Sequence, residues 1–252
     1  MNRIIENYSL LIYSKITPMT KISSGIKELD NLLFGGLPKG RCYLLSGEPG
    51  VGKTILTLQY LLHGAKNNEN CAYISIDEKP EHILSDAQSL GWDLDPYLKN
   101  KTLQFLDFSE FFGQLHLDEE NSINRIIDTI ETFIQKNNIS RLVIDPIAPI
   151  IFSEQSPLPV IEYIRRLIFT LENYTECTTL VTSLIPVGSN ALSQHGIEEF
   201  ASSGIILLRL QKEKNNYIRT LRLRKMRGTQ IDLSEYTFDI LPKRGIVLRQ
   251  AL

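Results

Sequence analysis

The sequence predicts an α/β fold in which a mainly parallel central sheet is covered by helices on both faces. Short apolar segments alternate with helix-length amphipathic segments along most of the chain, a pattern typical of βαβ units. One strand-to-helix junction also carries the glycine-rich pattern of a phosphate-binding loop. No apolar run approaches the length of a membrane span, and three cysteines scattered over 252 residues favour a reducing, cytoplasmic environment over a disulfide framework.

The expected elements follow one another in strict alternation. Short apolar strands are expected at residues 41–46, 71–76, 102–105, 141–144, 178–182 and 204–208. Amphipathic helices are expected between them, at residues 54–65, 80–90, 122–136 and 158–174. We expect the strand at 71–76 to lie beside the strand at 41–46. After Gly204 the pattern changes to strands and turns, which predicts an antiparallel addition at the sheet edge.

The glycine-rich pattern is GEPGVGKT at residues 47–54, which satisfies G-x-x-x-x-G-K-[ST] between an expected strand and an expected helix. Gly47, Gly50 and Gly52 let successive backbone N–H groups turn inward as an anion nest at a helix N-terminus. Lys53 would reach the β- and γ-phosphates of a nucleotide, and the Thr54 hydroxyl would complete a Mg²⁺ shell. The remaining predicted nucleotide-binding positions are Glu48, Pro49, Val51 and Ile55. A chance glycine-rich turn is the weaker alternative, because the flanking strand and helix are both in place.

A second carboxylate is needed to hold Mg²⁺ through water, and Asp145 supplies it. It ends the apolar segment RLVID, and the carboxyl ends of parallel strands face the ligand crevice. The alternative is a turn-forming Asp before Pro146, so the prediction for Asp145 depends on the presence of Lys53.

Hydrolysis also requires a group that orients or deprotonates the attacking water. Asp77 and Glu78 end the strand at 71–76, and one of them is the best candidate. The two acids could equally begin the helix after Pro80, where negative charge suits the helix dipole. From the residues alone the two interpretations are balanced.

Taken together, the motifs resemble the KaiC family within the RecA superfamily. The segments that carry the resemblance are SSGIKELDNLLFGGLPKGRCYLLSGEPGVGKT, SLGWDL, RLVID, GIEEF and RKMRGT. The similarity begins at about Lys21, so it implies one RecA-like P-loop domain at residues 21–252 after an extension at residues 1–20. It also implies a homo-oligomeric ring, usually a hexamer, with ATP and Mg²⁺ held between adjacent subunits.

The resemblance assigns roles to individual residues. Lys53 and Thr54 fall on the phosphate-binding pair and Asp145 on the magnesium-side acid. Asp77 and Glu78 fall on two adjacent glutamates that activate water. Because Asp77 is one methylene shorter than the glutamate at that position, Glu78 is favoured as the catalytic base, with Asp77 retained as a candidate.

Two cations near the C-terminus are also assigned by the resemblance. Lys225 and Arg227 fall on a lysine and an arginine that reach across the interface to the γ-phosphate of a neighbouring subunit's ATP. Positions two apart on a strand project to the same face, which agrees with a paired role. The alternative is a solvated, basic edge strand, because several basic residues lie close by, namely Lys212, Arg219, Arg222 and Arg224.

A second KaiC motif argues against one activity of the family. Glu198 and Glu199 stand where the phosphorylated KaiC domain carries a Ser-Thr pair. Neither glutamate offers a hydroxyl, so no autokinase activity is expected.

The leading hypothesis is a slow ATPase whose ring reports its nucleotide state to a regulatory protein partner. A non-hydrolysing ATP-dependent assembly switch is the first alternative, favoured by Asp77. A DNA-binding motor is the second, but residues 146–158 and 183–200, where such motors place their DNA loops, contain no Lys or Arg. The net charge of −2 also argues against a nucleic-acid partner.

Overall fold

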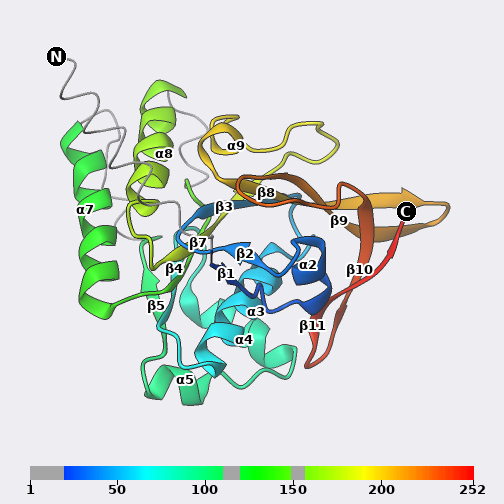
Figure 1. The fold of residues 1–252 in the computed structure, drawn as a ribbon, viewed down its shortest axis with the longest axis horizontal. Helices are drawn as coiled ribbons and strands as arrows, with labels where there is room; N and C mark the ends of the chain where they lie inside the picture. The colour runs from blue at the N-terminus through cyan, green and yellow to red at the C-terminus, as the bar shows by residue number, and fades with distance from the viewer. Residues whose placement is uncertain (1–19, 110–119, 149–156) are drawn as a thin grey trace.

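A nine-stranded sheet forms the centre of the protein in the computed structural model, which describes residues 20–109, 120–148 and 157–252 (Figure 1). Its strands are β3 (Cys42–Gly47), β4 (Cys71–Ser75), β5 (Leu103–Asp107), β6 (Arg141–Asp145), β7 (Thr178–Leu184), β8 (Gly204–Glu213), β9 (Asn216–Met226), β10 (Glu235–Leu241) and β11 (Gly245–Ala251). They are arranged in the order β11-β10-β9-β8-β3-β7-β6-β4-β5. In this lateral order, β8, β3, β7, β6, β4 and β5 run parallel to one another, whereas β11, β10, β9 and β8 pair antiparallel. The predicted parallel sheet with an antiparallel addition is therefore confirmed.

Two expectations about strand positions are wrong. The strand that precedes Asp77 does not lie beside the strand of the glycine-rich loop, because β7 and β6 separate β4 from β3. Strand β9, which carries Arg219, Arg222, Arg224 and Lys225, is not an edge strand, since β8 and β10 flank it. Alternation along the chain identifies strands, but their lateral order depends on packing between distant segments.

Helices cover both faces of the sheet (Figure 1). One face packs against α2 (Lys27–Leu32), α3 (Lys53–Lys66), α4 (Pro80–Ser89) and α5 (Asp95–Lys99). The other packs against α7 (Glu120–Asn137), α8 (Pro157–Leu171) and the short α9 (Glu198–Ala201). Strands β3, β4 and β7 are buried along most or all of their length, as expected for strands covered on both sides.

The elements that sequence periodicity missed are all short. They are α2, α5, α9 and a two-stranded pair formed by β1 (Lys21–Ile22) and β2 (Leu37–Pro38). Segments of two to six residues are too short to show a period of 3.6 or 2. Within the three described stretches of the chain, no helix is both long enough and apolar enough to cross a membrane. The predicted extension at residues 1–20 lies almost wholly outside the described residues.

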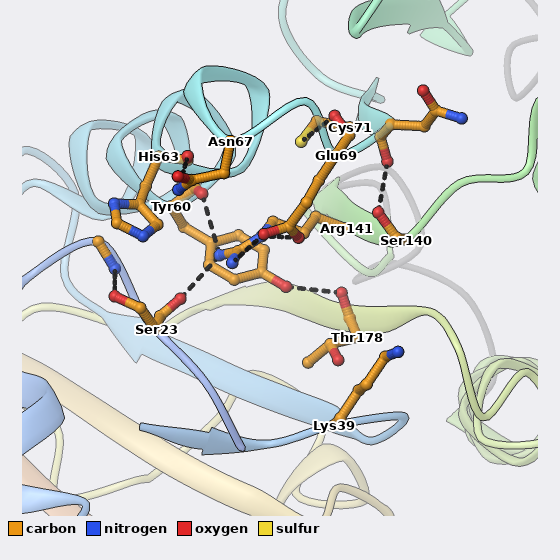
Figure 2. A network of polar contacts seen from close by, with 12 residues as sticks. Ser23, Lys39, Tyr60, His63, Asn67, Glu69, Cys71, Ser140, Arg141 and Thr178 are labelled. Atoms are coloured by element: carbon orange, nitrogen blue, oxygen red, sulfur yellow. Dashed lines mark hydrogen bonds and ion pairs between the residues drawn. The ribbon is translucent and has the colours of Figure 1, made fainter. Parts of the chain in front are cut away.

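An ion pair between buried Arg141 and partly exposed Glu69 lies at the amino ends of the parallel strands, opposite their carboxyl ends (Figure 2). Arg141, the first residue of β6, is 1 % exposed, and its Nε lies 2.6 Å from Glu69 Oε2. Its other nitrogens donate to Glu69 Oε1, Ser23 O and Tyr60 O, and its guanidinium lies 4.7 Å from the centre of the Tyr60 ring. Gly64 leaves room for it, since a Cβ there would lie 2.4 Å from Arg141 Cδ. This cluster joins β6, α3 and the segment before α2.

Candidate functional site

The glycine-rich loop connects the end of β3 to the start of α3. Gly52 precedes the helix with φ 114°, a backbone conformation that residues other than glycine rarely adopt. A Cβ there would lie 2.9 Å from Ile240 Cδ1. Glu48 and Val51 are buried, whereas Pro49 and Gly50 form the exposed tip of the loop. Ile55 is partly buried and packs on the core beneath the loop. The loop thus opens toward solvent at the N-terminus of a 14-residue helix.

Lys53 lies over the loop that precedes it. Its Nζ donates to Gly47 O at 2.8 Å and to Glu48 O at 3.0 Å. Burial lowers the pKa of Lys53, while the charges of Asp145 and Glu48 partly oppose that shift. An ammonium group held against a glycine-rich loop, beside the positive end of a helix, suits the phosphates of a nucleotide.

Asp145 lies at the carboxyl end of β6, close to the first turn of α3. Its Oδ2 is 3.4 Å from Thr54 Oγ1. Two further hydroxyls donate to the same carboxylate, Tyr73 to Oδ2 and Thr182 to Oδ1. Sequence reasoning missed Tyr73 and Thr182, although both belong to strands that converge on the site. Burial, followed by the charge of Asp145, raises the pKa of Tyr73 well above its ordinary value, so this hydroxyl keeps its proton and acts as a donor.

The donor set around Asp145 fits Mg²⁺. This ion prefers carboxylate, hydroxyl and water oxygens and usually keeps several of its waters. The Thr54 hydroxyl and the Asp145 carboxylate lie side by side at the base of the loop. In a magnesium–nucleotide complex, Thr54 would be a direct ligand and Asp145 would accept from a metal-bound water.

A pocket of about 160 Å³ brings five predicted residues together. Its lining includes Lys53, Thr54, Asp77, Glu78 and Asp145. The two acids reach this pocket although β4 lies three positions from β3, because all of these strands end at the same edge of the sheet. Tyr73, Thr182 and Gln194 line the same pocket.

Glu78 is exposed to solvent at the pocket, and its pKa is raised above the ordinary value. Burial raises its pKa first, and the negative charges of Asp86 and Asp145 raise it further. A carboxylate with a raised pKa is a stronger base once ionised. The Ser75 hydroxyl donates to the backbone carbonyl of Glu78 and holds the turn after β4.

Lys225 and Arg227 lie apart from this pocket. Lys225 is in β9 opposite Ile205, which belongs to the core under α7 and α8, whereas Leu221 and Leu223 of the same strand face the core under α3. A bulge between these pairs turns Lys225 to the α9 side, and Arg227 follows directly after the strand. The two cations therefore lie together on the face of the sheet opposite α3.

The comparisons with known proteins agree with this arrangement. Residues 22–252 match the family model described as "ATPase: KaiC". The circadian clock oscillator protein KaiC of Prochlorococcus marinus is 33 % identical over 221 residues, which cover 87 % of this chain and 43 % of KaiC. The chain thus spans less than half the length of that relative.

Two archaeal proteins from Pyrococcus horikoshii are similar over nearly their whole length. The UPF0273 protein PH0284 is 29 % identical over 238 residues, covering 90 % of this chain and 93 % of that protein. The crystal structure of the KaiC-like protein PH0186 matches with a TM-score of 0.80 at 30 % identity, covering 92 % of this chain and 100 % of the archaeal one. With the fold, the phosphate loop and the family model in agreement, the chain belongs to the KaiC family of ATPases.

Proposed function

We propose that this protein binds Mg²⁺-ATP and hydrolyses it slowly to ADP and phosphate. One observation carries the proposal: the residues of a phosphate loop, a magnesium site and a pair of candidate bases line a single pocket. The proposed domain is residues 21–252, without autokinase activity at Glu198 and Glu199.

The mechanism assigns each group a separate task. The loop amides and Lys53 bind the phosphates. Thr54 and Asp145 would hold Mg²⁺, which would supply positive charge to stabilise the transferred phosphoryl group. Glu78 accepts a proton from the attacking water or orients it, with Asp77 as the second candidate. The water oxygen bonds to the γ-phosphorus as the bond to the bridging oxygen breaks, so that ADP and phosphate form.

Lys225 and Arg227 are proposed to act on the nucleotide of a neighbouring subunit. They lie on the face of the sheet away from α3, which argues against their acting on a nucleotide bound at the phosphate loop of the same subunit. A cation supplied in trans stabilises transition-state charge and makes hydrolysis depend on assembly. The family resemblance supports a homo-oligomeric ring, usually a hexamer, with ATP at its interfaces. The proposal also places the ring in the cytoplasm and has a regulatory protein partner respond to its nucleotide state.

The test combines phosphate release with size measurement. Wild-type protein with Mg²⁺-ATP should release phosphate and form a larger species than without nucleotide. Lys53→Ala should abolish release, whereas Lys66→Ala, an exposed lysine at the other end of α3, should leave it unchanged. Equal release by Lys53→Ala and wild type would refute the ATPase proposal.

The same experiment separates the two alternatives. ATP-dependent assembly without phosphate release would favour the non-hydrolysing switch, for which the shorter Asp77 is the specific argument. The segment Ser183 to Phe200 lacks Lys and Arg, so no single-stranded DNA binding is expected at moderate salt. A salt-dependent DNA complex would revive the motor hypothesis.

A further inference from the structure

The loop between β7 and α9 touches the nucleotide pocket. Gln194 lines that pocket, and its backbone N–H donates to Ser183 Oγ at 3.0 Å. Ser183 belongs to β7 and directly follows Thr182, whose hydroxyl donates to Asp145. The Ser46 hydroxyl donates to the Leu192 carbonyl, which fastens the same loop to β3. The loop therefore contacts the pocket directly, so a change in the pocket can be transmitted to it.

Glu198, the first residue of α9, is anchored to the same serine. Its side chain is fully buried, at 0 % exposure. Glu198 Oε1 accepts hydrogen bonds from Ser183 Oγ at 3.0 Å and from the backbone N–H of His195 at 3.2 Å. Glu198 Oε2 has no hydrogen-bond partner within the described stretches of the chain. One carboxylate oxygen thus links the first residue of α9 to β7 and to the loop before the helix.

Backbone carbonyls in and after α9 accept hydrogen bonds from Lys225 and Arg227, the two cations proposed to act in trans. Lys225 Nζ donates to Ser202 O at 2.6 Å, to Glu199 O at 2.9 Å and to Phe200 O at 3.3 Å. Arg227 Nη2 donates to Phe200 O at 3.3 Å. Glu198 and the three carbonyls that accept from Lys225 all lie within residues 198–202, in α9 or directly after it.

We propose that Glu198 is a positioning residue that ties the nucleotide pocket of one subunit to the cations which that subunit offers to its neighbour. The hydrogen-bonded chain runs from Gln194 through Ser183 and Glu198 to α9, and from its carbonyls to Lys225. This inference rests on the proposed function, in which Lys225 and Arg227 act in trans. It assigns Glu198 no contact with ATP.

The single variants test the hydrogen bonds. Glu198→Ala removes both of them, and the resulting misplacement of Lys225 should lower phosphate release by about ten- to a hundredfold. Glu198→Gln keeps the accepting oxygen and should stay within about twofold of wild type. Glu176→Ala is the matched control, since Glu176 is exposed and its ion pair with Lys39 lies outside this chain of bonds, and it should resemble wild type. Equal losses in Glu198→Gln and Glu198→Ala, or no loss in either, would overturn the proposal.

Mixed assemblies distinguish positioning from general damage. The second component of the mixture is the Asp77→Asn/Glu78→Gln double variant. Its own nucleotide site lacks both candidate bases and is inactive, but its Lys225 and Arg227 can still act on a neighbouring subunit. The Glu198→Ala protein and the double variant are mixed one to one before Mg²⁺-ATP is added. About half of the Glu198→Ala sites should then receive intact cations from a double-variant neighbour. Phosphate release per Glu198→Ala subunit should then rise by about five- to fiftyfold, half of the expected loss. Damage confined to the subunit's own pocket would not be rescued.

Lys225→Ala in the same mixture separates the two proposals. Rescue of both variants supports the role of Glu198. Rescue of Lys225→Ala without rescue of Glu198→Ala overturns that role and leaves the trans cations standing. No rescue of Lys225→Ala in assembled mixtures overturns the trans role and the inference that rests on it. Should Glu198→Ala not fold, Ser183→Ala, which removes the linking hydroxyl, replaces it with the same expected outcomes.

Discussion

Removing the carboxylate of Glu69 should destabilise the fold far more than its partly exposed position suggests. Breaking a buried ion pair by deleting one partner costs about 3–5 kcal/mol, because the other charge stays buried without compensation. The Arg141 side chain is only 2 % exposed and Glu69 is 31 % exposed, so solvent offsets part of the loss. Arg141 also keeps its bonds to Ser23 O and Tyr60 O. We therefore expect Glu69→Ala to lower the free energy of unfolding by about 2–4 kcal/mol.

Urea denaturation followed by circular dichroism measures this difference. Glu176→Ala is the matched control, because Glu176 is 82 % exposed and its ion pair with Lys39 lies at the surface. An exposed pair contributes about 0–1 kcal/mol, so the midpoint of the control should barely move. A Glu69→Ala loss within about 0.5 kcal/mol of the control would refute the reasoning that the desolvated guanidinium depends on this carboxylate.

Three further predictions concern the pocket. Tyr73→Phe removes a hydroxyl that donates to Asp145, so the Mg²⁺ concentration for half-maximal hydrolysis should rise by about tenfold, and an unchanged Mg²⁺ titration would contradict this. Burial and the charge of Asp86 raise the pKa of Glu78, and the proposed mechanism requires Glu78 to be ionised. Asp86→Asn should therefore lower that pKa and move the acidic fall in the hydrolysis rate to lower pH. An unmoved pH profile would argue against Glu78 as the base. Gly52→Ala forces φ 114° on a residue with a Cβ, at about 1–3 kcal/mol, so calorimetry should detect no ATP binding although circular dichroism shows a folded protein.

Much of the local structure was predictable because it depends on residues close in sequence. The apolar run at Arg141–Asp145 is a strand, as predicted from RLVI, and α3 starts at Lys53, directly after the loop glycines. All three cysteines are buried, in or beside apolar strands. The strand expected at 204–208 continues to Glu213, because pairing with β9 carries it through a polar segment that lacks a strand pattern.

The sequence by itself determined the fold class, the phosphate loop and which acids end their strands. These features depend on local spacing: glycines where the backbone must turn, apolar runs where strands are buried, and carboxylates at strand ends. The tertiary structure alone decided that β6 and β7 separate β4 from β3, that Tyr73 and Thr182 hold Asp145, and that Lys225 lies on the face opposite α3. Each of these depends on the lateral order of strands or on a bulge in the ladder, and packing between segments far apart in the chain sets both.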